Sequence, residues 1–218
     1  LHALARSPRL GRLVYGSTSG VYGDCGGDRV DETRRLAPLS DRARRRVDAE
    51  QRLRVFGRGF GVAVTTLRIP GIYALGRAGG DPRERLARGT PVLLAADDVV
   101  TNHIHADDLA RACVAALYRG RSQRAINVSD DSQLRMGDYF DLAADTFAMP
   151  RPPRVSREVA RAMLSPMQMS FLSESRQLVN RRLKDELRLV LRHPDVASGL
   201  RAEGATPGAA VRGTRPSS

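Results

Sequence analysis

The sequence predicts an α/β fold built around a parallel β-sheet, because its first third contains a strand–helix–strand pattern. Residues 12–16 form a short apolar run, and residues 62–68 form a β-branched run bounded by glycine and proline. Between them, residues 40–56 have apolar positions at helical spacing. Short apolar strands of this kind are typical of parallel sheets that are buried on both faces. We therefore expect a right-handed βαβ unit in which strand 12–16 pairs in parallel with strand 62–68.

The boundaries of this unit have local signals. Residues 1–9 read as the end of a helix that Pro8 breaks, and residues 25–38 read as a polar loop over a site. Ser40 or Asp41 can cap the helix at 40–56. Three glycines are expected to end that helix: Gly57, Gly59 and Gly61.

Later segments alternate between the two element types. Strands are expected at 92–94 and 125–128, and helices at 83–88, 107–118, 136–147, 156–165 and 173–188. Asp107 is expected to start the helix at 107–118. Residues 204–218 are rich in Gly, Pro, Ser and Arg and have little to bury, so a disordered tail is expected there.

Composition excludes several classes of protein. No apolar run approaches the ~18 residues of a transmembrane helix, and the N-terminal residues lack the apolar region of a signal peptide. Cys25 and Cys113 are the only cysteines, and their spacing is not that of metal ligands. Reduced thiols in a cytoplasmic protein are therefore expected.

The formal net charge of +12 raises the question of nucleic-acid binding. Lys184 is the only lysine, and the arginine clusters at 34–35, 44–46 and 181–182 have no interleaved aromatic residues. Solvated arginine faces are favoured over a specific nucleic-acid site, with weak attraction to polyanions from charge alone.

Residues 13–24 carry the most informative motif, Leu-Val-Tyr-Gly-Ser-Thr-Ser-Gly-Val-Tyr-Gly-Asp. Small residues allow a ligand to approach the backbone, and hydroxyl groups can reach its polar atoms. The stretch resembles the active-site strand of the extended short-chain dehydrogenase/reductase superfamily, of the NAD-dependent epimerase/dehydratase type. In that family an apolar strand runs into Ser-Ser/Thr-x-x-Val-Tyr-Gly.

Four more segments resemble motifs of the same family, in the family's order. They are residues 38–50, 68–73, 103–110 and 126–130, which extend the resemblance over about residues 10–150. Residues 170–176, 180–182 and 193–195 are similar to a subgroup of bacterial members.

The resemblance implies a fold and a division of the chain. It implies the C-terminal part of a Rossmann-type parallel sheet with a smaller α/β substrate lobe. Residues 1–75, with 102–130 packed back onto them, would be the remaining half of a dinucleotide-binding domain. Residues 76–203 would be the substrate-binding lobe. A complete relative would carry out NAD- or NADP-linked redox, epimerisation or dehydration on a sugar nucleotide or similar small polar molecule.

Two departures concern the catalytic helix. The family uses a tyrosine as general acid/base, a lysine four residues later that holds the nicotinamide ribose, and a Ser/Thr that orients the substrate oxygen. Thr18 matches the hydroxyl position, whereas Arg42 replaces the tyrosine and Arg46 the lysine. Arginine stays protonated, so Arg42 can stabilise negative charge but is a poor proton shuttle. Alternatively, both arginines are exposed or ion-paired residues of the helix without a role in ligand binding.

A further departure is the absence of the family's glycine-rich pyrophosphate turn, G-x-x-G-x-x-G, from this sequence. About 80–100 residues of a Rossmann half are expected to be missing before Leu1, so the chain is expected to be truncated. Binding of NAD or NADP by this chain alone is therefore doubtful, and it is expected to be inactive alone. Strand 12–16 is expected to be an exposed edge that favours aggregation or a partner, including a second copy.

The resemblance also assigns residues around the site. Cofactor contacts are expected from Ser17, Arg46, Pro70, Gly71 and Ile72, and substrate contacts from Tyr22, Tyr73 and Arg77. His103 and His105 face one side of an extended segment, but structural hydrogen bonding is preferred and no metal is expected. A non-catalytic relative that binds a nucleotide or a protein is the alternative function.

Overall fold

A three-stranded parallel sheet with the order β1-β3-β8 forms the centre of the molecule. The structure, a computed structural model, describes residues 1–6 and 9–204. The sheet strands are β1 (Arg12–Thr18), β3 (Ala63–Ile69) and β8 (Arg124–Asn127). β1 and β3 pair in parallel from Arg12 opposite Ala63 to Thr18 opposite Ile69, which confirms the predicted βαβ unit and the α/β fold class.

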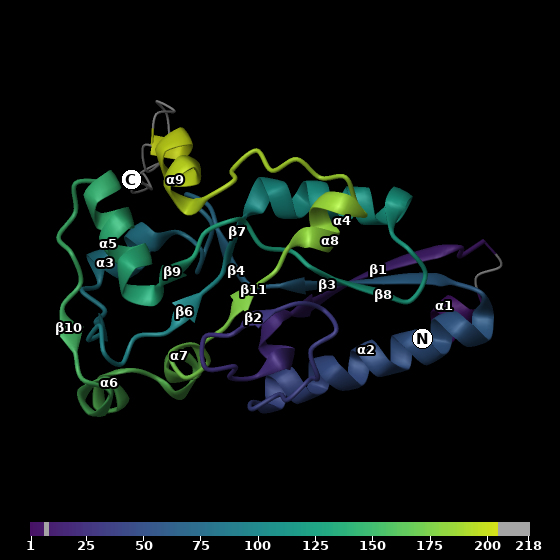
Figure 1. The fold of residues 1–218 in the computed structure, drawn as a ribbon, viewed down its shortest axis with the longest axis horizontal. Helices are drawn as coiled ribbons and strands as arrows, with labels where there is room; N and C mark the ends of the chain where they lie inside the picture. The colour runs from purple at the N-terminus through teal and green to yellow at the C-terminus, as the bar shows by residue number, and fades with distance from the viewer. Residues whose placement is uncertain (7–8, 205–218) are drawn as a thin grey trace, which may run out of the picture.

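Helices cover both faces of this sheet (Figure 1). α2 (Asp41–Phe60) crosses between β1 and β3 and packs against both strands. α4 (Ala106–Arg119) packs against the same strands from the other face, and α8 (Arg181–Asp185) packs against β8. Each face has its own buried apolar core.

A smaller lobe lies beyond the carboxyl ends of the sheet strands (Figure 1). Its elements are α3 (Pro82–Ala87), β5 (Val92–Leu93), β6 (Val100–Thr101), β9 (Leu134–Arg135), α5 (Met136–Thr146), β10 (Arg154–Val155), α6 (Arg157–Met163), α7 (Pro166–Phe171) and α9 (Val196–Gly204). Aromatic residues from α5 pack here with Tyr73 and Leu86 in a separate core.

Short elements lie between the lobe and the sheet. They are the 3-10 helix η1 (Ser19–Tyr22), β2 (Arg29–Val30), β4 (Gly71–Tyr73), β7 (His103–His105) and β11 (Gln177–Leu178). The short helix α1 (His2–Ala5) lies at the other end of the sheet, beside the end of α2 (Figure 1). β4 pairs with β7, and β2 with β11, so residues far apart in sequence are held together near the strand ends. Within the described ranges, no helix is both long enough and apolar enough to cross a bilayer.

The helix at 40–56 was predicted too short. Ser40 caps it as expected, since its Oγ accepts a hydrogen bond from the Ala43 N–H at 3.2 Å. The helix then continues through Gly57 and Gly59, and only Gly61, with φ +67°, ends it. Gly57 serves close packing instead, because a Cβ there would lie 2.7 Å from the Val62 carbonyl oxygen.

The single helix expected at 173–188 is also wrong. Gln177–Leu178 forms β11 against β2, and the chain becomes helical only at Arg181–Asp185. The helix at 107–118 begins one residue earlier than predicted and is capped by His105, not by Asp107. The loop expected at 25–38 contains β2. Gly204 belongs to α9, while Pro8 and residues 205–218 lie outside the described residues.

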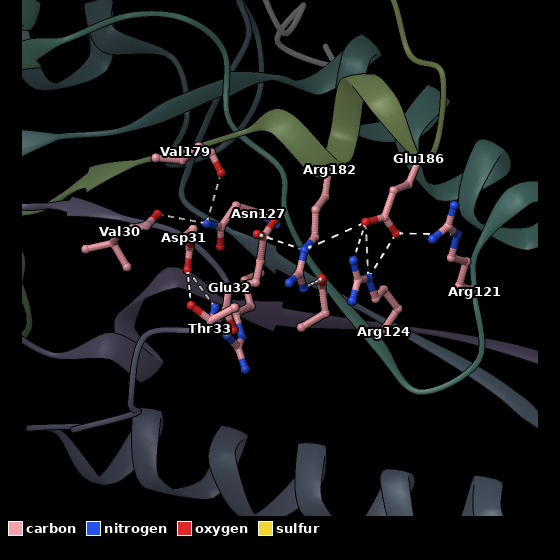
Figure 2. Close-up of polar contacts among 12 residues, drawn as sticks. Val30, Asp31, Glu32, Thr33, Arg121, Arg124, Asn127, Val179, Arg182 and Glu186 are labelled. Carbon is pink, nitrogen blue, oxygen red and sulfur yellow. Dashed lines mark hydrogen bonds and ion pairs between the residues drawn. The ribbon is translucent and has the colours of Figure 1, made fainter.

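The β8 edge of the sheet is closed by an ion pair (Figure 2). The Val128 N–H donates to the Arg68 carbonyl, so Ala125 and Asn127 direct their backbone groups away from β3. The Asn127 N–H donates to Glu32 Oε1 at 2.8 Å, and Arg182 Nη1 donates to the Ala125 carbonyl at 3.0 Å. Glu32 and Arg182 themselves lie 3.3 Å apart, so together they occupy the place of a fourth strand.

The β1 edge has no such cover. The Ala63 N–H donates to the Gly11 carbonyl, so the even-numbered residues of β1 direct their backbone groups to the open side. In the described chain β1 pairs only with β3. One side-chain contact reaches this edge, from Arg46 Nη1 to the Gly16 carbonyl at 3.3 Å. Strand 12–16 is therefore an edge strand, as predicted.

Candidate functional site

A cavity of about 480 Å³ lies between the carboxyl end of the sheet and the smaller lobe. This is where open α/β sheets bind their ligands. Its size is that of a small-molecule pocket. Of the residues predicted from the sequence, seven line it: Thr18, Arg42, Pro70, Gly71, Ile72, Tyr73 and Arg77.

One end of the cavity is formed by the end of β1 and the start of α2. Thr18 Oγ1 accepts a hydrogen bond from the Gly20 N–H at 3.2 Å, which leaves its hydroxyl proton to donate to a ligand. Arg42 lies in the first turn of α2, with its guanidinium over the Phe171 ring at 5.0 Å. Among the described residues, no carboxylate pairs with Arg42, so its N–H groups remain for a ligand.

A second group of arginines lies at the α3 side: Arg77, Arg85 and Arg88. Arg85 is half-buried, with its guanidinium over the Phe140 ring at 4.4 Å from the centroid, and its Nη2 donates to the Pro91 carbonyl. Its Nε is buried without a hydrogen-bond partner among the described residues. Burial and the nearby Arg88 charge lower the pKa of Arg85 to about 10.

The acidic side chains of the cavity are already engaged. Asp81 forms an ion pair with Arg83 at 2.7 Å, and Glu174 with Arg176 at 2.8 Å. Glu84 accepts a hydrogen bond from the Gly79 N–H. Five arginines line the cavity against these three carboxylates, so the lining carries net positive charge and favours an anionic ligand.

The wall between the two arginine groups is aromatic. Tyr73 is buried, and burial raises its pKa. His103 stacks on Tyr139 with ring centroids 4.1 Å apart, and burial lowers the His103 pKa to about 3. His103 is therefore neutral at ordinary pH, and its Nδ1 has no partner in the described part of the chain. Such a wall can contact a sugar ring or a base.

Ser17 and Tyr22, two further predicted site residues, are absent from the cavity lining. Ser17 Oγ donates to Glu50 Oε1 at 2.5 Å, and Glu50 pairs with Arg68 at 2.8 Å. Tyr22 accepts from Arg68 Nη1 and donates to Asn127 Oδ1. Burial raises the pKa of Tyr22 to about 12. In this structure both hydroxyls belong to a buried network under the site.

Arg46 lies one turn beyond Arg42 but does not line the cavity. Its Nη1 donates to Tyr15 Oη at 3.0 Å and to the Gly16 carbonyl, and its guanidinium lies over the Tyr15 ring. It therefore lies beside the open edge of β1.

Pro70, Gly71 and Ile72 form the wall at which the resemblance places the nicotinamide. A Cβ at Gly71 would lie 3.3 Å from the Asn102 carbonyl oxygen, so the backbone is closely packed here. These residues suit one end of a dinucleotide only, since the sequence has no glycine-rich turn for the pyrophosphate.

His105, Asp107 and His193 each have a potential metal-ligand atom, and these atoms lie within 4.8 Å of one another. However, His105 Nδ1 accepts the Asp107 N–H at 3.2 Å, and its Nε2 lies 3.1 Å from Glu203 Oε1. Both ring nitrogens thus have protein neighbours, and the absence of a metal stays a prediction.

Sequence reasoning missed the contribution of α3 and α7. Arg85 and Arg88 were assigned only to a short helix, and Phe171 only to a subgroup motif. The two arginines are three residues apart, which places them on the same side of a helix, and this spacing is the signal that was available in the sequence. That Phe171 stacks on Arg42 depends on a long-range contact that no local pattern encodes.

Comparison with known proteins agrees with this geometry. Residues 1–129, more than half of the chain, match the family described as the NAD dependent epimerase/dehydratase family. The chain belongs to this family. Among curated proteins, none matches the sequence significantly.

Solved structures share the fold. A functionally unknown conserved protein from Silicibacter pomeroyi is 32% identical with a TM-score of 0.80, over 94% of this chain and 69% of that one. UDP-glucuronic acid 4-epimerase from Bacillus cereus, solved with NAD, is 18% identical with a TM-score of 0.71, over 93% of this chain and 63% of that one. dTDP-glucose 4,6-dehydratase from Bacillus anthracis, solved with NAD, is 16% identical with a TM-score of 0.71, over 88% of this chain and 60% of that one. The chain thus spans about 60–69% of the length of these structures.

Proposed function

We propose that the cavity is the substrate site of an NAD(P)-dependent epimerase/dehydratase-like oxidoreductase that acts on a sugar nucleotide or a similar small phosphorylated molecule. The observation that carries this proposal is the half-buried Arg85, whose Nε is buried without a hydrogen-bond partner among the described residues and which lines the cavity without an ion pair. A guanidinium that is removed from water without a carboxylate is unfavourable. A substrate phosphate would restore the missing charge and the missing hydrogen bond.

The remaining residues suit the two ends of such a substrate. Arg77 and Arg88 add positive charge beside Arg85, where the phosphates would lie. Thr18 would orient the oxygen at the reacting carbon, and Arg42 would stabilise negative charge on the substrate. The sugar-nucleotide epimerases and dehydratases among the similar structures support this substrate class.

The nicotinamide, when bound, supplies the hydride donor or acceptor. In this chain Pro70, Gly71 and Ile72 would line its pocket. Ser17 would contribute only if it left Glu50, and Arg46 would reach the ribose only if it left Gly16.

We propose that residues 1–75 with 102–130 form the cofactor side, that 76–203 form the substrate lobe, and that the protein acts in the cytoplasm. These 218 residues alone are proposed to be inactive and to bind NAD and NADP weakly or not at all, because the glycine-rich turn is absent.

A non-catalytic relative is the second candidate. Arginine at the position of the family's proton-transferring tyrosine favours it, because arginine does not exchange its proton at ordinary pH. Such a protein would still bind the phosphorylated ligand. Binding and turnover must therefore be measured separately.

Isothermal calorimetry with UDP-glucose, and with uridine as the phosphate-free control, tests the substrate site. We expect UDP-glucose to bind and uridine not to bind measurably. Arg85→Ala should weaken UDP-glucose binding by about 10- to 100-fold, the effect of a lost charge-assisted hydrogen bond. The matched control is Arg54→Ala, an exposed arginine of α2 outside the cavity lining, which should leave affinity unchanged. No binding of UDP-glucose, or equal affinity in Arg85→Ala, would overturn the proposal.

A further inference from the structure

We propose that Arg42 makes this cavity selective for a substrate whose sugar carries a carboxylate, in addition to the phosphates at the α3 side. This inference rests on the proposed function and names a finer substrate class for the same site. It concerns the end of the cavity that the α3 arginines do not reach.

The guanidinium of Arg42 is positioned as a recognition group. It lies over the Phe171 ring at 5.0 Å, and both residues line the cavity. A cation–π contact of this kind restrains the guanidinium without using its N–H donors. A planar fork of donors matches a carboxylate, which can accept two parallel hydrogen bonds.

No protein group competes for these donors. In the described ranges Arg42 has no ion pair, whereas Arg44, two residues later on α2, pairs with Asp41 at 2.7 Å. Of the three lining carboxylates, Asp81 and Glu174 are each paired with another arginine, and Glu84 accepts the Gly79 N–H. Arg42 is therefore left for an anion that comes from outside the chain.

The helix itself favours an anion at this place. Arg42 lies in the first turn of α2, where the helix dipole disfavours a cation and favours a negative charge. Ser40, the N-cap of this helix, lines the same cavity. A carboxylate here would interact with Arg42 and with the positive end of the helix together.

The position relative to Thr18 indicates which part of the substrate carries the carboxylate. Thr18 and Gly20 lie beside the first turn of α2, since a Cβ at Gly20 would lie 3.6 Å from Thr18 Oγ1 and 3.8 Å from the Ala43 Cβ. The arginines of α3 line the cavity from the smaller lobe (Figure 1). A substrate that places phosphate at α3 would therefore place its sugar near Arg42. A uronate has its carboxylate on that ring, whereas the corresponding neutral sugar has a hydroxymethyl group.

UDP-glucuronic acid and UDP-glucose form a matched pair of probes, since they differ only in this group. By calorimetry, the unmodified protein should bind the acid at least about tenfold more tightly, as expected for one bidentate charged contact. Arg42→Ala should weaken binding of the acid about tenfold more than binding of UDP-glucose, so that the preference for the acid is lost. Arg42→Lys, which keeps the charge but not the fork, should retain part of the preference.

Two controls separate the possible causes. Arg45→Ala removes an exposed arginine of the same helix that is outside the lining, and it should keep the full preference. Arg85→Ala should weaken both probes equally. Melting temperatures of all variants establish that they are folded.

The outcomes are distinguishable. Equal affinity for the two probes in the unmodified protein, or a preference that persists in Arg42→Ala, would overturn the inference and leave the phosphate site standing. If neither probe binds, the proposed function fails together with it.

Discussion

The two edges of the central sheet differ in how their backbone groups are satisfied. At β8, the Asn127 N–H and the Ala125 carbonyl have side-chain partners in Glu32 and Arg182 (Figure 2). At β1, the Gly16 carbonyl contacts Arg46, and no second strand pairs with this edge in the described chain. Side chains from distant segments can thus satisfy the backbone groups of an edge strand in place of a further strand. The edge that lacks such side chains is where another strand can pair with the sheet.

Breaking the closed edge should give the largest effect. Arg182→Ala leaves the buried Glu32 carboxylate unpaired and the Ala125 carbonyl without its donor. The free energy of unfolding should fall by about 3 kcal/mol, as for other buried pairs that lose one partner. Urea denaturation measures this, with Arg181→Ala, an exposed neighbour, as the control that should change by less than about 0.5 kcal/mol. Equal losses in the two variants would show that the ion pair does not close the edge.

Near the closed edge, a buried carboxyl makes the stability of the protein depend on pH. Burial raises the pKa of Asp130, three residues after the end of β8, to about 7, and its Oδ2 has no partner in the described residues. Because the folded state binds this proton more tightly, its contribution to stability is complete below about pH 4 and is lost as the pH rises to about 7.

The expected loss across this interval is about 2–4 kcal/mol, measured by urea denaturation at several pH values. Asp130→Asn should remove it, since the amide oxygen can still accept the Ser132 N–H. Asp185→Asn, which changes an exposed carboxyl on α8, should retain it. A flat profile in the unmodified protein would contradict the buried, protonated Asp130.

The open edge should be revealed by self-association. The Gly16 N–H faces the open side by the alternation of β1, and a Cβ at Gly16 would meet only Ile69 Cδ1 at 3.5 Å. Gly16→Pro therefore removes a donor from the open edge without removing one from the β1–β3 ladder. Light scattering over a concentration series should show association of the unmodified protein and less in the variant, with stability changed by less than about 1 kcal/mol. A monomer at all concentrations would contradict self-association through the open β1 edge.

The sequence was informative where the pattern is local. A strand at 62–68 was predicted because β-branched residues are bounded by Gly61 and Pro70, and the structure has it at Ala63–Ile69. Both signals act within a few residues. The start of α2 was predicted from Ser40 for the same reason. Belonging to the epimerase/dehydratase family was predicted from motifs in order, and the comparisons confirm it.

Elements defined by long-range contacts were not predictable in this way. β11 exists because Gln177–Leu178 pairs with Arg29–Val30, far away in sequence, and the local pattern alone favoured a helix. The same holds for the pair of Glu32 and Arg182. In the candidate site, the hydroxyls of Ser17 and Tyr22 suited a ligand by type, but buried Arg68 and Glu50 engage them instead.

The single lysine of the chain is a site for selective chemical labelling beside the closed edge. Lys184 lies on α8, on the helix that also carries Arg182, and its ammonium is partly exposed beside Asp131 at 2.6 Å. Every other strongly basic side chain is an arginine, which amine-reactive dyes leave unmodified. A fluorophore attached through an amide bond would therefore enter at α8 and at the terminal amine, while the arginines of the cavity stay unlabelled. The chain thus has a natural position for a reporter beside its closed edge, without any engineered cysteine.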